Sequence, residues 1–77
     1  MKTKQNEFIQ NIANSCDVPY DLAWSIIKAI IDGIKAELHY GNEVEFWGLG
    51  KFYVKRTQYD TLIPKFKPSV IFKKEFK

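Results

Sequence analysis

The sequence predicts a small α+β fold: two helices, then an antiparallel sheet, then a short final helix. Apolar residues recur at helical spacing through most of the first forty residues. From Glu43 to Arg56, apolar and polar residues alternate instead, which is the period of a half-buried strand. Gly48 and Gly50 interrupt that alternation and indicate a hairpin turn between two strands.

The size of the chain allows one domain, which we expect over residues 1–77. Hydrophobic residues make up 45% and charged residues 27%, as in a soluble globular protein. Burial in so small a core barely exceeds a conformational entropy cost on the order of 100 kcal/mol. Because Cys16 and His39 are each single, neither an internal disulfide nor a zinc site is expected. A partner chain is therefore the expected source of extra stability.

Two helices account for the first part of the chain. The first is predicted over about residues 4–15 and the second up to about His39, from the spacing of their apolar residues. Between them, Asp17 can cap the second helix, and Pro19 suits its first turn, where the missing N–H is not needed. Gly41 can end the second helix in a left-handed conformation.

The second helix has a broader apolar face than one short helix and a small sheet can cover. That face comprises Leu22, Ile26, Ile27, Ile30, Ile31, Ile34 and Leu38. A subunit interface explains it, although an ordinary core helix is the alternative. The residues expected at the interface are Ile26, Ile27, Ile30, Ile34, Leu38, Phe46 and Phe52.

Strands are predicted at NEVEFW (42–47) and KFYVKR (51–56), joined through the glycine turn. A third, shorter strand is predicted at TLIPKF (61–66), where Pro64 confines it to a sheet edge or ends it early. The segment KPSVIFKKEF (67–76) predicts the final short helix, with Pro68 near its first turn.

Charge is distributed unevenly along the chain. Residues 1–50 carry four lysines against seven acidic residues, whereas residues 51–77 carry eight basic residues against two acidic ones. Phenylalanine and tyrosine are interleaved with the basic residues. This pattern is typical of a surface that binds a polyanion, and a solvated lysine surface is the alternative.

The stretch IANSCDVPYDLAWSIIKAIIDGIKAELHYGNEVEFWGLGKFYVKR, followed by IPKFKPS, resembles the HU/IHF family of bacterial histone-like DNA-bending proteins. Its most specific part is GNEVEFWGLGKFYVKR, which is similar to the family's strand, glycine-rich turn and second strand with a basic end. Leu49 stands where the family usually has phenylalanine. The resemblance implies an intertwined homodimer, with the helices as its base and the sheets as a saddle over double-stranded DNA.

The link between the last two strands departs from the family. There, these strands continue into a long arm with an intercalating proline at its tip, whereas the link here is TQYDT. So short a link fits a tight hairpin loop. We therefore expect an armless saddle that binds the phosphate backbone weakly, with high salt sensitivity, little sequence preference and little bending.

The resemblance also suggests which residues bind DNA. Lys55, Arg56, Lys67 and Lys73 match basic positions of the family, and Lys4 lies near a family phosphate contact. Lys51, Lys65 and Lys74 add further charge, so the complete expected set is Lys4, Lys51, Lys55, Arg56, Lys65, Lys67, Lys73 and Lys74.

A protein-interaction module with the same fold is the alternative function. It would use aromatic residues such as Trp24, Trp47, Tyr53 or Tyr59, and it could pair with or antagonise a full-length HU-type protein. No catalytic residue, metal ligand or cofactor is expected, because no serine has a plausible base beside it and no phosphate-binding loop is present. No signal peptide or membrane span is recognised, so a cytoplasmic, nucleoid-associated protein is expected.

Overall fold

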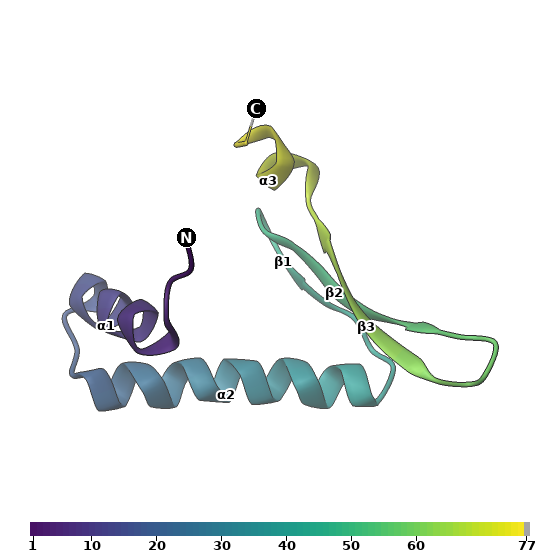
Figure 1. The fold of residues 1–77 in the computed structure, drawn as a ribbon, viewed down its shortest axis with the longest axis horizontal. Coiled ribbons are helices and arrows are strands. Elements are labelled where there is room, and N and C mark those ends of the chain that lie inside the picture. Colours follow the sequence, from purple (N-terminus) through teal and green to yellow (C-terminus); the bar gives the residue numbers. More distant parts are fainter. Residues whose placement is uncertain (77) are drawn as a thin grey trace. The chain divides into compact units, whose positions relative to one another are not determined.

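A computed structural model describes residues 1–76 and confirms the predicted α+β order (Figure 1). The elements are α1 (Gln5–Cys16), α2 (Tyr20–His39), β1 (Val44–Phe46), β2 (Gly50–Arg56), β3 (Leu62–Pro68) and α3 (Val70–Lys74). They divide into two compact units, one up to Asp32 and one from Gly33 onward, and α2 belongs to both.

The junction between α1 and α2 differs from the prediction. Asp17 ends α1 rather than capping α2: it adopts a left-handed conformation (φ 55°, ψ 50°), and its N–H donates to the carbonyl oxygen of Asn14 at 3.3 Å. Aspartate tolerates this conformation better than most residues. Pro19 directly precedes α2, and its carbonyl oxygen accepts the N–H of Ala23 at 3.1 Å. Its position suits proline, because the start of a helix uses the carbonyl group but leaves the N–H free.

The first unit has a very small core. Ile9, Ala13 and Ala23 are the buried hydrophobic residues among residues 1–76. Four partly buried residues pack against them: Val18, Tyr20, Trp24 and Ile27. Ile27 thus contacts the core of its own chain. Ile26, Ile30 and Ile31 of α2 remain exposed. So few buried side chains supply little of the hydrophobic free energy that a fold of this length needs.

The C-terminal end of α2 is capped as predicted. Gly41 has a φ of +79°, and its N–H donates to the carbonyl oxygen of Leu38 at 3.0 Å. The N–H of Asn42 donates to the carbonyl oxygen of Glu37, also at 3.0 Å. These bonds satisfy carbonyl groups that the helix itself leaves free and turn the chain toward β1.

The second unit contains an antiparallel sheet in the order β1-β2-β3. Strand β3 is a full seven residues long, so Pro64 does not shorten it. Its edge position explains why, since proline at an edge need not donate to a ladder. Pro68 closes β3 instead of opening the last helix, and Ser69 caps α3 with a hydroxyl that accepts the N–H of Phe72 at 3.0 Å.

The glycine turn places β1 and β2 side by side and lets β3 approach closely. Gly48 has a φ of +82°, and the N–H of Leu49 closes the turn on the carbonyl oxygen of Phe46 at 3.0 Å. Gly50 has a φ of +152° and is opposite Pro68 in the sheet. A Cβ atom at Gly50 would lie 2.4 Å from the carbonyl oxygen of Lys67, so only glycine fits.

A tight loop of residues 57–61 joins β2 to β3, as the sequence predicts in place of an arm. The N–H of Thr57 donates to the carbonyl oxygen of Thr61 at 2.8 Å, and the N–H of Asp60 donates to that of Thr57 at 3.0 Å. The hydroxyl of Thr57 also accepts the N–H groups of Tyr59 and Thr61, at 3.3 and 3.2 Å. This hydrogen-bonding closes the ribbon directly beyond Arg56 and Leu62.

Candidate nucleic-acid interface

One face of the sheet is basic. Because side chains alternate along a strand and paired residues share a face, the register of β2 and β3 identifies its members. Lys51 is paired with Lys67, Tyr53 with Lys65, and Lys55 with Ile63. We call these six residues the basic face. It carries four lysines from two neighbouring strands, with Tyr53 between Lys51 and Lys55 along β2.

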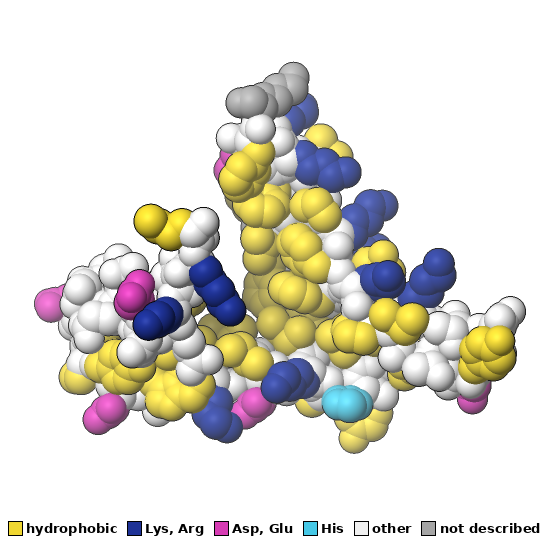
Figure 2. Space-filling view, in the orientation of Figure 1, with side chains coloured by type: hydrophobic (Ala, Val, Ile, Leu, Met, Phe, Trp, Pro, Cys, Tyr) yellow, Lys and Arg dark blue, Asp and Glu magenta, His cyan; other side chains and the backbone are white. Residues whose placement is uncertain are grey.

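The opposite face of the sheet is apolar. It presents Val44, Phe46, Phe52, Val54, Leu62, Pro64 and Phe66, and we call it the apolar face. The ring of Phe52 lies 6.2 Å from that of Phe46 and 4.9 Å from that of Phe66, measured between centroids. In Figure 2, Lys and Arg side chains gather along one side of the sheet, and hydrophobic side chains cover the other. The sheet is therefore strongly two-sided.

The charge of the basic face is partly neutralised at one end only. The ammonium group of Lys51 lies 3.5 Å from a carboxylate oxygen of Glu43, and Glu45 on β1 is paired with Lys51 in the register. Lys51 also lies 5.9 Å from the centroid of the Tyr53 ring, close enough for a cation–π interaction. Among residues 1–76, no ion pair involves the other lysines of this face: Lys55, Lys65 and Lys67. Their charge is available to an external anion.

Arg56 does not extend the basic face. It is paired with Leu62, and alternation along β2 places it on the side of the sheet that carries Phe52 and Val54. Its guanidinium forms an ion pair with the carboxylate of Asp60 in the adjoining loop. The sequence pattern "KR" suggested two equivalent charges at the end of β2, but the structure separates Lys55 from Arg56.

The remaining basic residues lie on other elements. Lys73 and Lys74 are exposed in the last turn of α3, in the same unit as the basic face. Lys4 is the residue directly before α1 and belongs to the other unit. The structure thus brings four of the eight expected DNA-binding residues together on one surface. The register between β2 and β3 places these four lysines on one face, and that register could not be read from the sequence.

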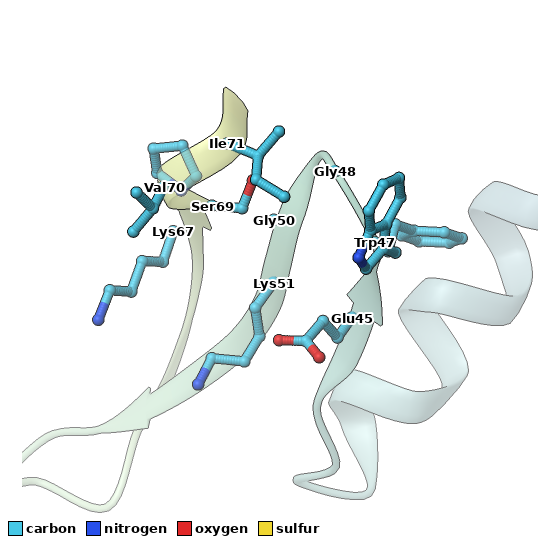
Figure 3. A pocket seen from close by; sticks show the side chains of 11 residues that line it. Glu45, Trp47, Gly48, Gly50, Lys51, Lys67, Ser69, Val70 and Ile71 are labelled. Atoms are coloured by element: carbon cyan, nitrogen blue, oxygen red, sulfur yellow. The ribbon is translucent and has the colours of Figure 1, made fainter. Parts of the chain in front are cut away.

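A hollow of about 340 Å³ lies where the β1–β2 turn approaches the junction of β3 and α3. Figure 3 shows Glu45 and Lys51 on one side of it, Lys67 on another, and Ile71 and Trp47 around the glycine turn. Trp47 is 90% exposed. The hollow has both charged and apolar walls, so it extends the basic face toward an aromatic side chain.

Neither a metal-ligand cluster nor a membrane-spanning helix is found within residues 1–76. No group of three or more histidine, cysteine, aspartate or glutamate side chains is arranged to hold a metal ion there. In the same residues, the helices lack the combination of length and hydrophobicity needed to cross a membrane.

Comparisons with known proteins point to one family. Residues 3–62 match the family described as bacterial DNA-binding protein. HU from Thermotoga maritima is 27% identical, with a TM-score of 0.84, and a point mutant of that protein is 25% identical, with a TM-score of 0.88. In both cases the match covers 97% of this chain and 100% of the other.

An HU–DNA cocrystal structure from Anabaena has the same fold, with a TM-score of 0.82 at 18% identity, and the match covers 96% of this chain and 97% of that one. No curated protein matches the sequence. The family match spans most of the chain, and the described residues have the HU fold with a short loop in place of an arm. This chain belongs to the family of bacterial DNA-binding proteins that includes HU and IHF.

Proposed function

We propose that this protein binds double-stranded DNA through the phosphate backbone, weakly and with little sequence preference or bending. The observation that carries the proposal is the basic face: four lysines on paired strands, three of which lack an ion pair within residues 1–76. Membership of a DNA-binding family supports the interpretation of these lysines as a polyanion-binding surface rather than a solvated surface. Binding of this kind would associate the protein with the bacterial nucleoid.

The chemistry of the basic face supports backbone contacts rather than base readout. Lysine is a compact positive charge on a flexible stem, which suits a phosphate oxygen but carries no sequence information. Because a tight loop directly follows β2, strands β2 and β3 do not extend into an arm that could reach around the duplex. Bending a short duplex costs about 1–6 kcal/mol, and the short sheet offers few additional contacts to offset that cost.

We infer that the active form is a homodimer. In the single chain, Ile26 is 51% exposed and Ile30 is 50% exposed on α2, and Phe46 on the apolar face is 38% exposed. Soluble proteins rarely leave apolar surface of this extent uncovered. A second copy that covers it would complete the core. It would also double the number of lysines presented to DNA.

Salt titration tests the DNA-binding proposal quantitatively. If each subunit uses the four lysines of the basic face, a dimer neutralises about eight phosphates, and log K falls with log[salt] with a slope of about −7. Affinity for a labelled random-sequence duplex should then fall about 10⁴-fold between about 50 and 200 mM NaCl. Fluorescence anisotropy measures this directly. Failure to bind at low salt, or an affinity indifferent to salt, would reject the proposal.

Bending is tested separately with a duplex labelled at both ends for energy transfer. We expect the transfer efficiency at saturation to stay close to that of free DNA, since no arm is present to hold a bend. A large increase in transfer would show that the short sheet bends DNA and would contradict this part of the proposal.

A protein partner is the second candidate. The exposed ring of Trp47 beside the hollow favours it, because tryptophan is enriched at protein interfaces. The partner fitting the fold best is a full-length HU-type chain, which would exchange for one subunit of the homodimer. Native mass spectrometry of a mixture with such a chain tests this: a heterodimer mass supports subunit exchange, and homodimer masses alone reject it.

A further inference from the structure

The loop between β2 and β3 holds an exposed aromatic ring at its tip. Tyr59 is 81% exposed, and hydrogen bonds within the loop close the turn around it. The hydroxyl of Thr57 accepts the N–H of Tyr59 itself, and the N–H and carbonyl groups of Thr57 bond to Thr61 and Asp60. Asp60 adopts a left-handed φ of 63°, which completes the turn. The loop therefore displays the ring without burying it.

The electrostatic setting of Tyr59 suits a polyanion. Asp60, the acidic neighbour, is paired with Arg56 and so contributes little net charge. Lys55 and Ile63 form the pair of the basic face nearest the loop, and only the Arg56–Leu62 pair lies between them and the loop. Trp47 is also exposed, at 90%, but the acidic residue Glu45 lines the hollow beside it. Tyr59 is thus the exposed ring near Lys55, at the end of the basic face where no lysine is in an ion pair within residues 1–76.

We propose that Tyr59 stacks on the exposed face of a nucleobase, either in single-stranded DNA or at an unpaired base in a duplex. This rests on the proposed DNA-binding function and adds a ligand that backbone contacts do not explain. Every base has a π-face, so an aromatic ring stacks on it without reading sequence. Tyr59 supplies the ring, and Lys55 holds the neighbouring phosphate. Because hydrogen bonds already fix the loop, little conformational entropy is lost on binding.

Three DNAs separate the two sources of an exposed base from ordinary backbone binding. They are a single-stranded oligo(dT), a duplex with one unpaired base, and the same duplex without it. The variant Tyr59→Ala removes the ring, Tyr59→Phe keeps it, and Gln58→Ala is a loop control at an exposed neighbour. We expect Tyr59→Ala to weaken binding about five-fold or more to the DNAs that expose a base. Its affinity for the perfect duplex should change by less than about two-fold, since a stacked duplex shows no base face.

A fluorescent base gives a second readout at saturating protein. With 2-aminopurine at the unpaired position, stacking by the wild-type ring should quench its fluorescence. Tyr59→Phe and Gln58→Ala should quench equally, and Tyr59→Ala should not. A loss on the oligo(dT) alone would assign the ring to single strands, and a loss on the unpaired-base duplex alone would assign it to distorted duplexes.

The outcomes separate this inference from the proposed function. If the wild-type protein binds none of the three DNAs, the proposed function itself fails. If it binds the perfect duplex with the expected salt dependence, but Tyr59→Ala binds all three DNAs as well as wild type, only the stacking inference is overturned. An equal loss on all three DNAs would also overturn it, because the perfect duplex offers no exposed base.

Discussion

Replacing Gly50 with alanine should damage the fold much more than the same change at Gly48. Both residues have positive φ, +152° and +82° respectively, but only Gly50 is crowded. Its added Cβ would lie 2.4 Å from the carbonyl oxygen of Lys67 and 2.9 Å from Cα of Pro68. Both are backbone atoms of β3, so neither can move without disturbing the β2–β3 ladder. At Gly48 the Cβ meets nothing within 4 Å.

The magnitude follows from adding strain and overlap. An unfavourable φ costs about 1–3 kcal/mol, and forcing extra volume into a close contact costs typically about 1–3 kcal/mol more. We therefore expect Gly50→Ala to lower the free energy of unfolding by about 2–6 kcal/mol. Gly48→Ala should cost only the conformational part, about 1–2 kcal/mol. Since small domains are stable by about 5–15 kcal/mol in total, Gly50→Ala brings the protein close to unfolding.

Urea unfolding followed by far-ultraviolet circular dichroism measures both values. The chain concentration must be the same throughout, because the apparent stability of a dimer depends on it. If the two alanine variants lose equal stability, the close approach of β3 to Gly50 is not what makes glycine necessary there, and the reasoning fails.

Three further predictions concern the basic face, the last helix and the subunit interface. Lys65→Gln should make the salt slope of DNA binding less steep by about 2, since a dimer loses two phosphate contacts. Arg56→Gln removes the ion-pair partner of Asp60 and should leave the slope unchanged. Equal changes in slope for the two variants would refute the division of the sheet into two faces. Ser69→Ala should lower the free energy of unfolding by about 1 kcal/mol through loss of the helix cap, and Ser69→Asp should retain it in the same urea assay. Ile30→Lys should abolish the dimer mass in sedimentation equilibrium, and an unchanged dimer would remove this residue from the interface.

Local features of the fold were predictable because neighbouring residues decide them. The helical spacing of apolar residues predicted α1 and α2, and Gly41 ends α2 as expected. The link TQYDT forms the expected tight loop. Where two local solutions competed, the sequence was ambiguous. Asp17 is as suitable for ending one helix as for starting the next, and Ser69 rather than Pro68 marks the start of α3.

The candidate site was predictable in composition but not in arrangement. The basic block at residues 51–77 is visible in the sequence, and four of its lysines do form one face. The sequence could not show that Lys51 lies opposite Lys67, because that pairing depends on the length of the loop and the register it sets. Nor could the sequence show that the guanidinium of Arg56 forms an ion pair with Asp60.

By itself, the sequence determined which segments are helix or strand, that the chain has an excess of apolar surface, and that its positive charge lies in the last third. These depend on composition and on contacts between near neighbours. Only the tertiary structure decided which lysines share a face and how closely β3 passes Gly50. The physical reason is that strand pairing joins residues far apart in the chain, and a shift of one residue in register would move every side chain of a strand to the opposite face.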